Sequence, residues 1–96
     1  EQRGRRPVLV VSREFSNQLL PVVTVLPLTS RKPGRRAYPN EAVVAADVGG
    51  LKAESLSLAH QVRTVSKLRL TIPAGYIDSP GERIAILSAL RFHLEL

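Results

Sequence analysis

The sequence predicts a mainly β domain, in which short strands form a small barrel or curled sheet that is closed by one C-terminal α-helix. Two observations lead to this fold class. Aliphatic, β-branched runs recur along the chain and are separated by segments rich in turn-forming residues. Only residues 78–96 combine a helix-start signal with a helical spacing of apolar residues. With 96 residues, of which 44% are apolar, we expect one domain over residues 1–96.

The first half of the chain predicts three strands. They are expected at residues 7–12, 22–30 and 41–46, which read "PVLVVS", "VVTVLPLTS" and "EAVVAA". The first is a continuous aliphatic run typical of a strand buried on both faces, and Pro7 favours extended backbone at Arg6. Pro27 marks an edge or a bulge in the second strand, because proline cannot donate to a ladder.

Residues 55–65 form the strongest predicted strand, because their side chains alternate in character. One face carries Leu56, Leu58, His60 and Val62, and the other carries Ser57, Ala59, Gln61 and Arg63. On this pattern His60 is a core histidine whose ring bonds to backbone.

The remaining segments are predicted as connections and one helix. We expect a loop with one helical turn at 13–21, a surface loop at 31–40, a turn capped by Ser66 at 66–70 and an extended connection at 70–77. In the helix, Ser79 and Glu82 have the spacing of a capping box and Pro80 holds the first helical position. Its predicted apolar face consists of Ile86, Leu87, Ala89, Leu90 and Leu94.

The net charge of +6 lies entirely in residues 1–40, which carry eight Lys or Arg and two acids. Residues 41–96 carry six basic and six acidic residues and are neutral. This asymmetry indicates a basic surface that faces an anionic partner, with nucleic acid the first candidate and membrane lipid the second.

The composition excludes several kinds of site. The chain has no cysteine, which excludes disulfides, zinc-thiolate sites and thiol catalysis. Two histidines without an H-x-x-x-H spacing argue against a metal site, so we expect no metal and no cofactor. The longest apolar stretch, residues 19–28, contains two prolines and is too short to span a membrane. We therefore expect a cytoplasmic protein.

Three segments in order, "EQRGRRPVLVVS", "VVTVLPLTS" and "HQVRTVSKLRL", followed by the helix, resemble the MazF/PemK toxin family. The resemblance implies a small SH3-like barrel of the PemK/CcdB type, a homodimer, and single-stranded RNA bound along a groove at the dimer interface. It also implies a sequence-specific, metal-independent endoribonuclease (an mRNA interferase) of a toxin–antitoxin module, with a cognate acidic antitoxin as partner. Members carry a further strand before the "EQxGxRP" motif, and we expect this first N-terminal strand to be absent here.

The resemblance assigns catalytic roles to Arg6 and Thr29. Arg6 matches the arginine before the proline, and a guanidinium held there presents two parallel donors to phosphate oxygens. Its permanent charge makes it an electrostatic stabiliser and a poor base. The Thr29 hydroxyl would donate to a non-bridging phosphate oxygen. Without the motif, a solvated arginine and a threonine bonded to its own backbone would be the ordinary interpretations.

A wider set of residues is predicted to bind RNA. It comprises Glu1, Arg3, Arg5, Ser30, Arg31, Lys32, Arg35, Arg36, Tyr38, Gln61 and Arg63. Within this set, Glu1 would pair with Arg6 or act as a base, and Gln61 would read a base edge or be an ordinary surface residue. His60 is a candidate proton shuttle because its reference pKa is near neutrality.

Two other functions remain open from the sequence. One is a non-catalytic toxin on the same fold, a CcdB-like gyrase poison that acts through its C-terminal helix. The other is a general RNA-binding barrel, which would bind RNA without cleaving it. The "GRRP" and "PLTS" motifs favour the nuclease, which would cleave by 2′-hydroxyl attack to leave a 2′,3′-cyclic phosphate and a 5′-hydroxyl.

Overall fold

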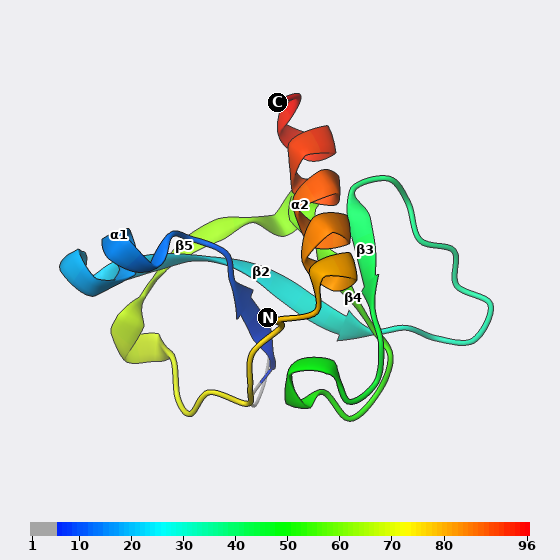
Figure 1. Cartoon of the computed structure of the whole chain (residues 1–96), viewed down its shortest axis with the longest axis horizontal. Helices are drawn as coiled ribbons and strands as arrows, with labels where there is room; N and C mark the ends of the chain where they lie inside the picture. Colours follow the sequence, from blue (N-terminus) through cyan, green and yellow to red (C-terminus); the bar gives the residue numbers. More distant parts are fainter. Residues whose placement is uncertain (1–5) are drawn as a thin grey trace.

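A computed structural model describes residues 6–96, which form an antiparallel five-stranded sheet with one long helix packed on it (Figure 1). The strands are β1 (Val8–Val10), β2 (Val22–Ser30), β3 (Glu41–Val44), β4 (Ser55–Leu58) and β5 (Arg63–Ser66). The α-helices are α1 (Glu14–Leu19) and α2 (Pro80–Leu94), and the 3-10 turns are η1 (Val48–Gly50), η2 (Ala59–Gln61) and η3 (Lys67–Arg69). The predicted class, mainly β with one C-terminal helix, is confirmed.

The long strand β2 pairs with three other strands, β1, β4 and β5. The sheet runs in the order β1-β2-β4-β3, and β5 pairs with β2 as well. Because β1 and β3 each pair with a single strand among residues 6–96, the sheet is open rather than closed into the predicted barrel. Strand β2 begins and ends at the residues predicted from the sequence, whereas β1 and β3 are shorter than predicted.

The predicted strand over residues 55–65 is wrong in its middle, where η2 separates β4 from β5. Val25 pairs with Arg63 and Leu28 pairs with Ser57, so three positions along β2 correspond to six along its partner. The three additional residues leave the ladder as η2. Pro27 lies in this gap, where no partner needs its missing N–H, which agrees with the predicted bulge.

This turn also reverses the prediction for His60, which is exposed rather than buried. The neighbouring Ala59 is the buried residue, and its N–H donates to the carbonyl of Asn40 at 3.1 Å. Strand alternation therefore ends at Leu58, and the side chains beyond it follow the geometry of a 3-10 turn.

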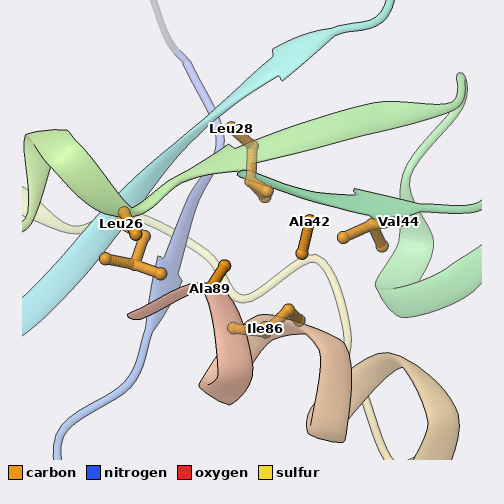
Figure 2. Close-up of a cluster of buried hydrophobic side chains, with 7 residues drawn as sticks. Leu26, Leu28, Ala42, Val44, Ile86 and Ala89 are labelled. Carbon is orange, nitrogen blue, oxygen red and sulfur yellow. The ribbon is translucent and has the colours of Figure 1, made fainter. Parts of the chain in front are cut away.

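The core lies between α2 and the sheet (Figure 2). It consists of Leu26, Leu28, Ala42, Val44, Ala59, Ile86 and Ala89. The helix face that reaches it is narrower than predicted: Leu90 is half-buried, whereas Leu87 and Leu94 are 50% and 47% exposed. Burial of these aliphatic side chains is the main favourable term that holds the helix to the sheet.

The start of α2 differs from the predicted capping box. Pro80 does hold the first helical position, but the Ser79 hydroxyl donates to Glu82 Oε1 at 3.0 Å instead of accepting from the helix backbone. The other Glu82 oxygen accepts from the N–H of Ala45 at 3.4 Å. Glu82 therefore ties the first turn of the helix to the end of β3.

The shorter connections largely follow the sequence. The Ser66 hydroxyl accepts from the N–H of Leu68 at 3.2 Å, which confirms the capped turn at 66–70. The one helical turn expected within 13–21 is the six-residue helix α1. Across residues 6–96, no helix has the length and apolar character needed to cross a lipid bilayer.

The packing of α2 predicts that Ile86→Ala lowers the free energy of unfolding by about 3 kcal/mol, because it leaves a cavity under the helix. Leu68→Ala is the control, since the Leu68 side chain is 95% exposed. The control should change stability by only about 0.5 kcal/mol. Urea unfolding at one fixed protein concentration measures both, and equal losses would show that α2 does not pack as described.

Candidate functional site

The register of β1 on β2 places Arg6 and Thr29 at the same end of this strand pair. Val8 lies opposite Pro27, and the N–H of Leu28 donates to the carbonyl of Pro7 at 3.2 Å. Extending this antiparallel register by two positions places Arg6 opposite Thr29. Directly opposed residues point to the same face of a sheet, with Cβ atoms about 5 Å apart. A guanidinium and a hydroxyl therefore share one face at the end of this strand pair.

This face is the one turned away from α2. Across the sheet, Leu28, Ser57 and Ala42 are opposed, and two of them belong to the core under the helix (Figure 2). The adjacent row of Thr29, Leu56 and Val43 therefore points to the other side. Arg6 is exposed and Thr29 is half-buried, so both can meet a ligand from solvent.

A recess of about 290 Å³ is lined by Pro7 and Ser30, the chain neighbours of the pair, but not by Arg6 or Thr29 themselves. It is bordered by residues 50–53 and by Ala74. These two segments approach so closely that a Cβ on Gly50 would lie 2.3 Å from the carbonyl oxygen of Ala74, and Gly50 has φ +79. Only glycine fits this position.

The loop between β2 and β3 is held by a bidentate ion pair. Arg35 donates to the two carboxylate oxygens of Glu41 at 2.9 and 2.8 Å, and the Glu41 side chain is only 4% exposed. The N–H of Tyr38 donates to Glu41 Oε1 at 3.0 Å, and the Arg35 guanidinium lies 5.8 Å from the Tyr38 ring centroid. The hydrogen bond from Arg35 is the main cause that lowers the pKa of Glu41, against the opposing effect of burial.

Two of the arginines predicted to bind RNA therefore have structural partners. Arg35 is neutralised by Glu41, and Arg31 donates from Nε to the Arg35 carbonyl at 2.8 Å while its guanidinium lies 3.7 Å from Glu54. The other two loop cations, Lys32 and Arg36, are exposed and have no ion pair within the part of the chain that the structure describes.

The remaining predicted residues lie at three places. Tyr38 is exposed in the loop, and Ser30 is exposed at the end of β2. Gln61 and His60 are exposed in η2, which packs against α2, and their Nε2 atoms are 3.4 Å apart. Arg63 is exposed at the start of β5 and borders the same large groove as Arg6. Arg6 and Arg63 thus border one groove, and the register places Thr29 opposite Arg6. Ser30 lies in the row of Ser55 and Val44, which points to the α2 side of the sheet, and Gln61 and His60 lie apart in η2.

Three further predicted residues, Glu1, Arg3 and Arg5, lie outside the described residues. Within residues 6–96, no group of three or more His, Asp or Glu side chains has an arrangement that could hold a metal ion.

Sequence reasoning missed Glu41 as the residue that fixes the loop. A signal was present, since an acid begins the strand that follows a basic loop ending in "YPN". An acid between basic residues and a strand can serve as an internal partner for one of them.

The chain matches the family described as PemK-like, MazF-like toxin of type II toxin-antitoxin system over residues 1–93. The chain belongs to this family. It is 32% identical over 101 residues to endoribonuclease MazF9 of Mycobacterium tuberculosis, across 100% of this chain and 83% of that relative. It is also 32% identical over 78 residues to endoribonuclease EndoA of Bacillus subtilis, across 81% of this chain and 66% of that relative.

Solved structures of MazF toxins share the fold. Mycobacterium tuberculosis toxin MazF-mt6 has a TM-score of 0.81 and 28% sequence identity, and the match covers 95% of this chain and 87% of that chain. A mycobacterial endoribonuclease in complex with its cognate antitoxin has a TM-score of 0.82 and 25% identity, and covers 97% and 84% of the two chains. The family predicted from the three motifs is confirmed.

The Arg35–Glu41 pair predicts how stability depends on pH. Because the pKa of Glu41 is lowered in the folded protein, its ionised form stabilises the fold above the ordinary value of 4.5, and this contribution is lost as the pH falls through the folded pKa. The free energy of unfolding should therefore decrease as the pH falls below the ordinary value of 4.5. Urea unfolding from about pH 7 to about pH 3 measures the slope.

Glu41→Gln should flatten this part of the profile and lower stability at neutral pH, because Arg35 loses its charged partner. Glu54→Gln is the control, since Glu54 pairs with Arg31 at 3.7 Å and its side chain is 52% exposed. It should leave the acid slope unchanged. If both variants keep the parent slope, Glu41 does not carry the acid sensitivity.

Proposed function

We propose that this chain is the endoribonuclease toxin of a toxin–antitoxin module and cleaves single-stranded RNA without a metal or other cofactor. The observation that carries the proposal is the opposition of Arg6 and Thr29 at the end of the β1–β2 pair. The enzyme class follows from membership of the toxin family and from two curated relatives that are named endoribonucleases. It is therefore preferred over a gyrase poison and over a barrel that only binds RNA.

The proposed reaction is an internal transfer at one phosphodiester. The ribose 2′-oxygen loses its proton and attacks the adjacent phosphorus, and the bond from phosphorus to the 5′-oxygen breaks. The products are a 2′,3′-cyclic phosphate and a 5′-hydroxyl, which takes up a proton. Negative charge on the non-bridging oxygens rises in the transition state, and donors placed there beforehand lower the barrier.

Arg6 and Thr29 supply such donors in this proposal. The Arg6 guanidinium remains charged through the reaction and offers parallel N–H groups to two phosphate oxygens. The Thr29 hydroxyl donates to a non-bridging oxygen from the neighbouring strand and fixes the phosphate in place. His60 as proton shuttle stays a prediction, and its position in η2 beside Gln61 would require RNA that extends to this turn.

The wider assembly is also part of the proposal. We expect a homodimer, since α2 exposes Ile84, Leu87 and Leu94 on the side away from the core. We expect a cognate acidic antitoxin, because a similar endoribonuclease was solved with its own antitoxin and this chain is basic. Lys32, Arg36 and Arg63 would contact RNA phosphates, and cleavage of mRNA would take place in the cytoplasm.

The role of Arg6 predicts that Arg6→Ala lowers kcat for single-stranded RNA by about 10²–10³, the effect of removing one preorganised donor. Cleavage is measured in EDTA on a defined RNA, and the ends are mapped to identify the cyclic phosphate. Arg91→Ala is the control, since Arg91 is exposed on α2. Cleavage by Arg6→Ala at the parent rate would remove Arg6 from the mechanism, and inhibition of DNA supercoiling without RNA cleavage would favour a gyrase poison.

The role of Thr29 predicts that its hydroxyl, and not its shape, is required. Thr29→Val keeps the branched side chain but has no donor, so kcat should fall by about tenfold or more, which corresponds to one neutral hydrogen bond in the transition state. Thr29→Ser keeps the hydroxyl and should retain most of the rate. Equal activity of the serine and valine variants would contradict the proposed donor.

A further inference from the structure

The β2–β3 loop (residues 31–40) is anchored on the sheet face that carries Thr29. Glu41 and Val43 are two residues apart in β3, so their side chains point to one face, and Val43 lies in the row of Leu56 and Thr29. Glu41 therefore points away from α2, to the face of the proposed active site. In Figure 1, α2 lies to the left of β3 and the loop lies to its right, which agrees with this register.

The carboxylate of Glu41 is the anchor of this loop. Its side chain is 4% exposed, and it accepts hydrogen bonds from two nitrogens of Arg35 and from the N–H of Tyr38. In the opposite direction, the N–H of Glu41 donates to the carbonyl of Tyr38 at 2.8 Å. A bidentate pair of this kind fixes the orientation of both side chains. Glu41 thus determines where the middle of the loop lies.

The first half of the loop is tied by its own hydrogen bonds. Pro33 and Gly34 are the central residues of a turn in which the N–H of Arg35 donates to the carbonyl of Lys32 at 3.0 Å. Gly34 has φ +76, as the second central residue of a type II turn requires. The Nε of Arg31 then donates to the carbonyl of Arg35 at 2.8 Å. The loop is therefore one unit, and its position depends on its anchor on β3.

The four cations of the loop fall into two pairs. Arg31 and Arg35 are held by acids of the protein itself. Lys32 and Arg36 are exposed and have no salt bridge in the part of the chain that the structure describes. Lys32 also follows Thr29, the proposed phosphate donor, by three residues. These two cations can therefore bind further phosphates of the strand that Thr29 contacts.

We propose that Glu41 is a positioning residue for the RNA, because it holds the loop on the Thr29 face, where Lys32 and Arg36 bind phosphates beside the one that is cleaved. Glu41 itself is covered by Arg35 and does not touch the RNA. The inference rests on the proposed nuclease function, since it concerns the same RNA strand. It gives the loop a role in binding the substrate and none in the chemical step.

Electrostatics and positioning predict opposite effects of removing the Glu41 charge. Loss of an acid from a protein that binds a polyanion increases its affinity, because the net charge becomes more positive. In the proposal, Glu41→Gln releases Arg35 and with it the loop, so Lys32 and Arg36 no longer face the strand. The affinity for RNA should then fall although the net charge rises. The sign of the change separates the two explanations.

The first test measures binding without cleavage. The probe is a fluorescein-labelled pool of random 2′-O-methyl RNAs of about eight nucleotides, in which the blocked 2′-oxygen cannot attack and the phosphate contacts are independent of sequence. By fluorescence anisotropy, Glu41→Gln should raise Kd by about tenfold, the effect of losing both loop cations at low salt. Glu54→Gln removes an equal charge from a pair whose acid is 52% exposed, and should leave Kd at or below the parent value. A Glu41→Gln affinity equal to or above that of the parent would overturn the proposal.

A double-mutant cycle tests whether Glu41 acts through the loop. Arg36→Ala should weaken binding and lower the slope of log K against log salt by about 0.7, whereas Arg91→Ala, which removes an exposed arginine of α2, should not. In the Glu41→Gln background, Arg36→Ala should have little further effect, because the loop is already displaced. Independent, additive losses would overturn the positioning role.

Arg35→Lys keeps the net charge and one ion pair but cannot form the bidentate contact. This variant covers the case in which Glu41→Gln does not fold. It should raise Kd by several-fold, and urea unfolding establishes that each variant is folded under the assay conditions. A folded Arg35→Lys variant with the parent Kd would contradict the need for the bidentate anchor.

Cleavage kinetics distinguish this inference from the nuclease proposal. With a defined single-stranded RNA, Glu41→Gln should raise KM and leave kcat near the parent value, because the loop contributes binding and not chemistry. A fall in kcat with unchanged KM would overturn the assignment. If the parent protein binds the octamer pool but does not cleave RNA, the nuclease proposal fails while the binding and cycle experiments still decide the role of Glu41.

Discussion

The three-residue pairing of β1 with β2 is the contact on which the candidate site depends. A shift of one residue would turn Arg6 to the face covered by α2 and separate it from Thr29, since side chains alternate with a period of two. So short a ladder has few hydrogen bonds with which to resist such a slip. Leu9 and Val11 supply the resistance, because both pack against the core under α2. The helix therefore stabilises the register of a strand whose functional residue lies on the opposite face.

The two prolines of this strand pair, Pro7 and Pro27, lie where strand pairing ends or where β2 changes partner. Pro7 accepts a hydrogen bond from Leu28 through its carbonyl but has no N–H to return, so the ladder loses half of its last rung. Arg6 lies beyond that rung and is exposed. Pro27 lies where β2 changes partner from β5 to β4, so its missing donor leaves no acceptor unsatisfied in the ladder. Pro27 thus avoids the usual cost of proline in a sheet, whereas Pro7 ends the β1–β2 ladder.

The elements that could be predicted from sequence are those set by local pattern. Strand β2, the start of α2 at Pro80 and the turn capped by Ser66 follow from β-branched runs, apolar spacing and caps. The prediction that Arg6 and Thr29 act together came from a family motif rather than from periodicity.

The predictions that were wrong concern features that depend on tertiary contacts. The alternation in residues 55–65 is correct up to Leu58, but the insertion of η2 depends on the register against β2, which no local pattern encodes. Likewise, the exposure of Leu87 and Leu94 depends on what covers the helix, and the closure of a barrel depends on which strand edges meet.

The distribution of basic residues over the folded protein differs from their distribution along the sequence. By sequence, the excess lies in residues 1–40, and residues 41–96 are neutral. In the fold, Arg35 is neutralised by an acid from the neutral half, while Arg63, Arg69 and Arg83 from that half face the groove along β1. The acids of the neutral half lie elsewhere: Glu41 is held by Arg35, and Glu82 bonds to Ser79 and Ala45. Folding therefore separates charges that balance in the sequence. Within residues 6–96 it gathers cations that form no salt bridge on the surface beside β1, where they attract an anionic ligand.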